Sequence, residues 1–249
     1  MKNLIAANWK LNPISQKSAE EIFSALCGPA SGWEETEVVI CPPFLYLPIF
    51  KKISFKNLAL GAQNCFWEEK GAFTGEISPA MIKDLGVEYV IIGHSERRKY
   101  FGETDEIINK KIIKALSAGL KIIFCVGETA EEKESGKRDE ILQRQLQQGL
   151  KDIVDIDNIN VAYEPVWAIS NGDPYKTKEL PTVEKIKEIS DYIRKFVKQN
   201  TRILYGGSAN VENARGYLKD AGMQGLLVGG ASLDAEEFVK IVESDRIAI

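Results

Sequence analysis

The chain has 249 residues, of which 44% are hydrophobic and 27% are charged, and its formal net charge is −4. This composition is that of an ordinary globular protein, and the acidic balance without a basic patch disfavours nucleic acid as a partner. No apolar run is long enough to span a membrane, and polar residues follow the first run too early for a signal peptide.

The cysteines and the histidine restrict the chemistry further. The four cysteines are scattered and form no C-x-x-C pair, which favours reduced thiols in a cytoplasmic protein. The single histidine, His94, excludes a histidine-rich metal site, and neither a Walker loop nor a G-x-G-x-x-G motif is present. We therefore expect no metal and no cofactor.

Short apolar runs rich in Val, Ile and Leu recur along the whole chain and predict strands. They occupy residues 4–7, 38–41, 58–62, 89–92, 122–126, 159–163, 203–205 and 226–228. The runs are nearly continuous rather than alternating, which is typical of parallel strands covered on both faces.

Helical segments lie between these runs. Apolar residues recur at three- and four-residue spacing over residues 16–26, 105–118, 141–153 and 183–197, and residues 234–242 form a last helical segment. Residues 95–98 predict the first turn of a short helix that begins after His94, and the charged run 131–140 predicts the solvated start of a helix. Strand and helix alternate eight times, which favours a single-domain α/β fold over residues 1–249, a closed (β/α)8 barrel, with a doubly wound open sheet as the alternative.

Reactive residues gather where the predicted strands end, which is where barrels of this kind place their active sites. The residues found there are Asn8, Trp9 and Lys10, then Gln63 and Asn64, then His94, Ser95 and Glu96, then Glu128, Glu164, Ser208, Gly229 and Gly230. Any one of them could be structural, because a lone histidine after a strand usually only makes hydrogen bonds. Their joint placement indicates an active site.

Glu164 ends an apolar run and is followed by the stiff Pro165, the bulky Trp167, further polar residues and Gly172. A carboxylate beside a hinged lid suits an enzyme that removes a carbon-bound proton and keeps water away. The alternative for an isolated Glu-Pro pair is a strand that ends in an ordinary solvated loop.

Glycine-rich turns follow the last two predicted strands. Glycine lets backbone N–H groups approach an anion, and barrels often bind phosphate after strands seven and eight. We interpret Ser208, Gly229 and Gly230 as phosphate-binding residues, with tight turns that bind no ligand as the alternative.

Six segments in these regions resemble the triosephosphate isomerase family. They are ANWK at 7–10, GAFTGE at 71–76, GHSERR at 93–98, YEPVWAI at 163–169, YGGS at 205–208 and GGASL at 229–233. They occur in the family's order and cover the chain from end to end, and the combination is highly specific. The resemblance implies a TIM barrel and a cofactor-free aldose–ketose isomerase of glycolysis and gluconeogenesis. Its small phosphorylated triose substrates would be dihydroxyacetone phosphate and D-glyceraldehyde 3-phosphate.

The resemblance also implies the catalytic roles. Glu164 would be the base that moves a proton between C1 and C2 through an enediolate. A neutral His94 would polarise the carbonyl, and this carboxylate–imidazole pairing is the one known for the family. Lys10, with Asn8 beside it, would hold the substrate, and Glu96 would support Lys10.

The remaining implied roles concern the phosphate, a lid and a partner subunit. The phosphate would contact Asn8, Lys10, Ser170, Ser208, Gly229 and Gly230. The lid, within residues 165–175, would comprise Pro165, Val166, Trp167, Ala168, Ile169, Ser170, Asn171 and Gly172. The loop residues Phe73, Thr74 and Gly75 would reach the other subunit of a homodimer.

The lid departs from the family's pattern. The usual Ala-Ile-Gly-Thr-Gly reads Ala-Ile-Ser-Asn-Gly at 168–172, and about four additional residues precede Pro181. Two other functions stay open. A barrel acting on indole or sugar phosphates would lack the Glu164 lid and the Asn8–Lys10 pair, and an inactive barrel with a binding role would lack Lys10, His94 or Glu164.

Overall fold

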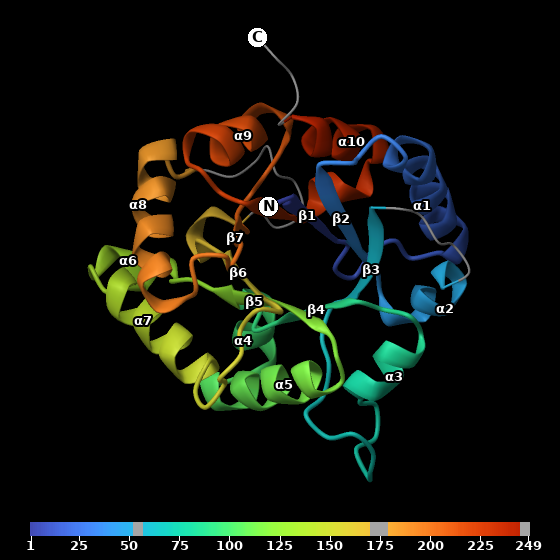
Figure 1. Cartoon of the computed structure of the whole chain (residues 1–249), viewed down its shortest axis with the longest axis horizontal. Helices are drawn as coiled ribbons and strands as arrows, with labels where there is room; N and C mark the ends of the chain where they lie inside the picture. Colours follow the sequence, from blue (N-terminus) through green and yellow to red (C-terminus); the bar gives the residue numbers. More distant parts are fainter. Residues whose placement is uncertain (52–56, 170–178, 245–249) are drawn as a thin grey trace.

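A computed structural model describes residues 1–51, 57–169 and 179–244. Within these residues eight parallel strands form a closed barrel in sequence order, and β1 closes the ring by pairing with β8 (Figure 1). The strands are β1 Asn3–Asn8, β2 Thr36–Cys41, β3 Leu58–Ala62, β4 Tyr89–Ile92, β5 Lys121–Val126, β6 Ile159–Tyr163, β7 Ile203–Tyr205 and β8 Gly225–Val228. The closure confirms the predicted single-domain (β/α)8 TIM barrel and rules out the open sheet.

Helices surround the barrel (Figure 1). They are α1 Gln16–Ala30, α2 Leu47–Phe50, α3 Pro79–Asp84, α4 Ser95–Phe101, α5 Asp105–Ser117, α6 Ala130–Glu134, α7 Arg138–Gly149, α8 Val183–Ile193, α9 Val211–Arg215 and α10 Ala235–Glu243. The run 131–140 belongs to two helices rather than one, because Gly136 adopts a left-handed φ of 70° between α6 and α7. The apolar spacing does not predict α2, α3 and α9, which are shorter than two turns.

Side-chain caps fix where several helices begin. Thr104 accepts a hydrogen bond from the backbone in the first turn of α5, and Thr182 and Asp234 do the same for α8 and α10. Each cap pairs a backbone N–H that the helix itself leaves unsatisfied. The loops between strand and helix are thereby held in place around the barrel.

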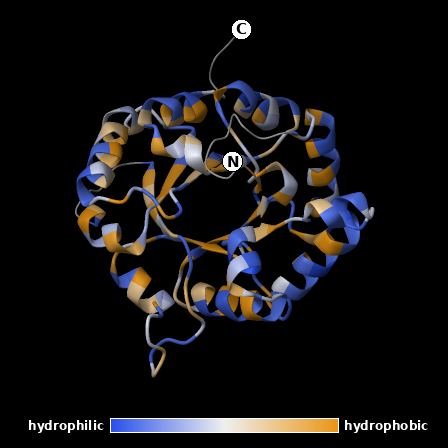
Figure 2. Cartoon of the chain, turned by 180° about the vertical axis from the view of Figure 1, so that it is seen from behind, coloured by the Kyte–Doolittle hydropathy of each residue, from blue (hydrophilic) through white to orange (hydrophobic). Residues whose placement is uncertain are grey.

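Side chains alternate between two apolar layers along each strand. In β1, Leu4 and Ala6 belong to a buried cluster made almost entirely of strand residues, which is the barrel interior. Ile5 and Ala7 belong instead to the cluster between the strands and the helices. Figure 2 shows the result, with apolar colour on the strands and hydrophilic colour over much of the outer helix surface. The packed interior makes the barrel a rigid support for the loops at its ends.

A polar network closes the barrel at the amino ends of the strands. Arg202 donates to Glu37 Oε2 at 2.8 Å, to Asn160 Oδ1 at 2.7 Å and to the Tyr89 hydroxyl at 3.1 Å. Burial alone would raise the pKa of Glu37, but hydrogen bonds from Tyr89 and Arg202 outweigh it and hold the pKa below its ordinary value. This end therefore contributes stability, and the opposite end is left for function.

Candidate active site

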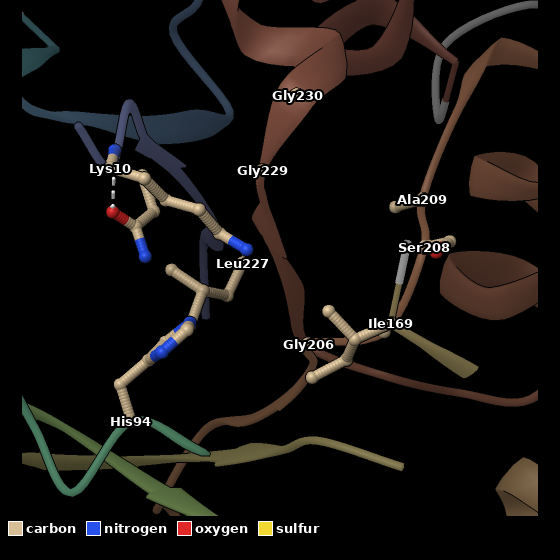
Figure 3. Close-up of a pocket in the computed structure, with 11 residues that line it drawn as sticks. Lys10, His94, Ile169, Gly206, Ser208, Ala209, Leu227, Gly229 and Gly230 are labelled. Atoms are coloured by element: carbon tan, nitrogen blue, oxygen red, sulfur yellow. Dashed lines mark hydrogen bonds between the residues drawn. The ribbon is translucent and has the colours of Figure 1, made fainter. Parts of the chain in front are cut away.

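The carboxyl ends of the strands surround a small pocket (Figure 3). It is lined by Asn8, Lys10, His94, Ile169, Gly206, Gly207, Ser208, Ala209, Leu227, Gly229 and Gly230. Seven of the predicted site residues thus line this pocket: Asn8, Lys10, His94, Ile169, Ser208, Gly229 and Gly230. They come from the ends of β1, β4, β7 and β8 and, for Ile169, from the beginning of the predicted lid after β6. Ala209 and Leu227 are not predicted, because a small or apolar side chain carries no chemical signal in a sequence.

Lys10 has a left-handed backbone conformation, with a φ of 53°. Its N–H donates to Asn8 Oδ1 at 3.1 Å, and its carbonyl oxygen accepts from Gln63 Nε2 at 2.9 Å. Such a conformation costs a non-glycine residue about 1–3 kcal/mol and persists only where its surroundings fix it. Figure 3 shows the side chain extending across the pocket toward Leu227 and Gly229. The strained turn therefore aims the ammonium into the pocket.

Glu96 connects Lys10 to His94. Its Oε1 accepts from Lys10 Nζ at 2.6 Å, and its backbone N–H donates to His94 Nδ1 at 3.2 Å. Burial alone would raise the pKa of Glu96, but the hydrogen bond and the charge of Lys10 outweigh it and hold the pKa below its ordinary value. Near neutral pH, Glu96 is therefore an anion that offsets the ammonium when no substrate is bound.

His94 lies at the N-terminus of α4, as predicted, and its side chain caps the helix. A backbone amide can only donate a hydrogen bond, so Nδ1, which accepts from the Glu96 N–H, carries no proton. A neutral imidazole in this position has its proton on Nε2. The Nε2–H group is then the donor that His94 offers to a carbonyl oxygen.

Glu164 follows β6, and only 1% of it is exposed. Its Oε2 accepts from the Ser95 backbone N–H at 2.8 Å. Its Oε1 lies 3.0 Å from His94 Nε2 but without the geometry of a hydrogen bond, so among the described residues this buried oxygen has no hydrogen-bond partner. A buried carboxylate oxygen with a free lone pair beside a proton donor is suited to abstract a proton.

Two glycines let neighbouring loops approach Glu164 closely. A Cβ on Gly127 would lie 1.7 Å from the Glu164 carbonyl oxygen, and one on Gly206 would lie 2.9 Å from Glu164 Cγ. Real Cβ atoms do not come so near, so both positions need glycine for reasons of space. Backbone thus lies close to Glu164 on two sides, against its carbonyl group at Gly127 and against its side chain at Gly206.

The beginning of the predicted lid is fixed to the barrel by polar contacts. The Ser208 N–H and hydroxyl both donate to the Ala168 carbonyl oxygen, at 3.1 and 2.8 Å. Trp167 Nε1 donates to Glu128 Oε1 at 2.8 Å, and the Tyr163 hydroxyl donates to the same oxygen at 2.9 Å. Burial raises the pKa of Glu128, although these hydrogen bonds act in the opposite direction. The sequence identifies Glu128 only as a residue at the end of a predicted strand. It does not predict the contact of Glu128 with Trp167, which depends on the fold.

Other predicted residues lie outside this pocket. Ser170, Asn171 and Gly172, with the rest of the lid to residue 175, fall outside the described residues. Phe73, Thr74 and Gly75 lie on the long loop between β3 and α3, which projects from the barrel in Figure 1. They are exposed and do not line the pocket of their own chain.

This arrangement suits acid–base chemistry on a small anion, as in a (β/α)8-barrel enzyme that transfers protons. The sequence profile of the triosephosphate isomerase family matches residues 3–245, nearly the whole chain. The chain belongs to the triosephosphate isomerase family.

Relatives with the name triosephosphate isomerase match over almost their full length. The Aquifex aeolicus protein is 46% identical over 253 residues, which cover 98% of this chain and 100% of the relative. The Dictyoglomus thermophilum protein is 47% identical over 249 residues, covering 98% and 99%. The Geobacter metallireducens protein is 46% identical over 250 residues, covering 96% and 97%. The chain is thus an aldose–ketose isomerase of triose phosphates, and the predicted family and activity are confirmed.

Proposed function

We propose that the chain interconverts dihydroxyacetone phosphate and D-glyceraldehyde 3-phosphate through an enediolate, with Glu164 as the base. The C1–H bond of the ketone breaks, the proton goes to Glu164, and the electron pair forms a C1–C2 double bond while charge moves to the oxygen on C2. Return of the proton to C2 gives the aldehyde. The buried Oε1 without a hydrogen-bond partner supports this assignment.

His94 and Lys10 act on the oxygens of the substrate. The Nε2–H of a neutral His94 donates to the carbonyl oxygen, and the same nitrogen moves a proton from O1 to O2 in the enediolate. Lys10 supplies a positive charge in a pocket largely shielded from water, where it stabilises the oxyanion more strongly than in bulk solvent. Asn8 orients Lys10 through the hydrogen bond to its N–H, and Glu96 positions the ammonium.

Substrate binding requires Glu164 to move. With Oε1 only 3.0 Å from His94 Nε2, no substrate atom fits between the two groups. The carboxylate also has to give up the hydrogen bond from the Ser95 N–H before it turns toward a substrate carbon. The structure therefore matches the substrate-free state, and binding exchanges these contacts for contacts with the substrate.

The phosphate binds at Ser208, Gly229 and Gly230, and at Ser170 from the lid. Gly229 carries no side chain, so anions can approach the backbone where the Lys10 side chain ends. In the structure the Ser208 N–H and hydroxyl both point at the Ala168 carbonyl oxygen. A phosphate that takes over these two donors releases Ala168, which couples phosphate binding to the lid at residues 165–175.

Closure of this lid protects the enediolate. An enediolate exposed to water expels phosphate, and a closed lid prevents that side reaction by excluding solvent. The bulky Trp167 follows the stiff Pro165 at the beginning of the lid, so its surroundings change when the lid closes.

The same chain forms a homodimer in which a loop of each subunit reaches the active site of its partner. A groove beside the active site is lined by Leu11, Phe44, Tyr100 and Phe101 together with His94 and Lys10. Leu11 is 91% exposed and Phe101 is 67% exposed, which is unusual for large apolar side chains of an isolated chain. The projecting loop with Phe73, Thr74 and Gly75 is the segment of a second copy that fits there.

The protein works in the cytoplasm, in glycolysis and gluconeogenesis. All four cysteines are free, as expected in a reducing compartment. No helix in the described part of the chain is long and apolar enough to cross a membrane.

The isomerase is tested by following D-glyceraldehyde 3-phosphate in D2O, in the presence of EDTA and without added cofactor. We expect dihydroxyacetone phosphate as the product, with deuterium incorporated at C1, because a proton held by Glu164 exchanges with solvent. Complete retention of the original hydrogen would indicate hydride transfer and contradict the mechanism. Turnover of indole or pentose phosphates, with no turnover of triose phosphates, would contradict the assigned substrate.

A further inference from the structure

One ammonium group contacts a residue near the beginning of the lid and a residue shortly after the end of the lid. Lys133, on α6, has its Nζ 3.4 Å from the centre of the Trp167 ring. The same Nζ lies 2.9 Å from Glu179 Oε1. Trp167 precedes residues 170–178 and Glu179 follows them, so the two flanks are joined through a residue that is distant in sequence from both.

We propose that Lys133 is a positioning residue that holds the two flanks of the lid in the substrate-free arrangement and so sets the balance between the open and the closed enzyme. The inference rests on the proposed function, in which Trp167 moves as the lid closes. It adds a residue on a different element, the helix α6, that controls this movement.

The Trp167 ring is fixed from two directions. Its N–H donates to the buried Glu128 at 2.8 Å, and Lys133 covers its face. Tryptophan is the side chain whose ring attracts a cation most strongly. The ring therefore cannot turn without losing both contacts, unless the Lys133 side chain follows it.

Lys133 is itself held firmly relative to the barrel. The short helix α6 begins with a capping box, in which Thr129 and Glu132 exchange hydrogen bonds between side chain and backbone. The Lys133 N–H donates to the Thr129 carbonyl oxygen at 3.0 Å. Only two residues separate Thr129 from the end of β5, so Lys133 is held close to the barrel. Trp167 and Glu179 are in turn held by the Lys133 ammonium.

Space for Trp167 to move lies beside this cluster. A cavity of about 590 Å³ is lined by Glu128, Lys133, Trp167, Glu179 and Pro181, among others. The ring can thus leave its present position without displacing the core. The contacts to Lys133 and Glu128, rather than crowding, then keep it where it is.

The two contacts of Lys133 differ in strength. The Glu179 side chain is 68% exposed, so its ion pair with Lys133 is weakened by salt and contributes little. The cation–π contact at a partly exposed site favours its bound state by a factor of about 2–5. Loss of Lys133 should therefore shift the enzyme toward the closed state by about that factor, and loss of Glu179 should shift it less.

The test uses Lys133→Met, which removes the charge but keeps the length, and Lys133→Arg, which keeps both contacts. Lys137→Met is the matched control, because it removes the same charge from an exposed position four residues later. The enzyme is labelled with 5-fluorotryptophan, and the Trp167 signal is assigned by its loss in Trp167→Phe. We then measure the ¹⁹F shift, the Kd of phosphoglycolate, and kcat and KM for D-glyceraldehyde 3-phosphate.

For Lys133→Met we expect a shifted Trp167 signal in the free enzyme and a Kd for phosphoglycolate about threefold lower, since less of the binding free energy is spent on opening these contacts. KM should fall with Kd, and kcat should fall because product leaves more slowly from a lid that favours closure. Lys133→Arg should restore wild-type values. If Lys133→Met gives the same results as Lys137→Met in all three measurements, the role of Lys133 is wrong, although the proposed lid can still stand. If the Trp167 signal of the wild-type enzyme does not change when phosphoglycolate is added, the proposed lid is wrong, and this inference is wrong with it.

Discussion

Gly206 is the position at which a single added methyl group should displace Glu164, the proposed catalytic base. In Gly206→Ala the added Cβ would lie 2.9 Å from Glu164 Cγ and 3.2 Å from the Tyr163 carbonyl oxygen. Unstrained carbon contacts lie at about 3.5–4.0 Å, so the Glu164 side chain has to move by roughly 0.5–1 Å. Misplacement by about 1 Å costs on the order of 10²-fold in rate. We therefore expect kcat to fall about 10²-fold, which corresponds to about 2.7 kcal/mol of activation free energy.

The assay is steady-state kinetics with D-glyceraldehyde 3-phosphate, together with the melting temperature and the Kd of phosphoglycolate. Gly28→Ala is the matched control, because a Cβ there meets nothing within 4 Å and the residue lies on the exposed side of α1. That variant should keep full activity. A folded Gly206→Ala enzyme that binds phosphoglycolate and keeps kcat within twofold of wild type would refute the argument that this contact places the base.

Two further predictions concern stability and assembly. The pKa of Glu37 is lowered in the folded state from an ordinary value of 4.5, so its stabilising effect is present above that pH and disappears as the pH falls through the folded value. Glu37→Gln should therefore reduce the free energy of unfolding by about 2 kcal/mol at pH 7, and a difference that stays constant down to pH 3 would contradict the network around Arg202. In sedimentation at micromolar concentration the chain should be a dimer. A fully active monomer would be evidence that the loop containing Thr74 is not needed in the active site of a partner subunit.

The barrel is predictable from the sequence because both faces of its strands are buried. This leaves nearly continuous runs of Val, Ile and Leu, and the predicted bounds of β3, β4, β6 and β7 agree with the structure. The short helices α2, α3 and α9 leave no periodic signal. They are formed where packing against the barrel favours them, and a local spacing rule does not detect that.

The candidate site is predictable only as far as it depends on reactive residues at strand ends. His94, Lys10 and Ser208 stand out because their side chains carry chemistry. The left-handed backbone of Lys10 depends instead on a hydrogen bond from Gln63, which is 53 residues away. The contact of Lys133 with Trp167 likewise joins two separate segments of the chain, and no local pattern in the sequence reveals it.

The proposed mechanism depends on Glu164 as the group that carries the proton, and Glu164→Gln removes this group. The amide keeps the shape of the side chain and can still accept the hydrogen bond from the Ser95 N–H, but it is no longer a base. We expect kcat for D-glyceraldehyde 3-phosphate to fall by about 10²–10⁴ while phosphoglycolate still binds. A Glu164→Gln variant with near-normal kcat would show that Glu164 is not the base.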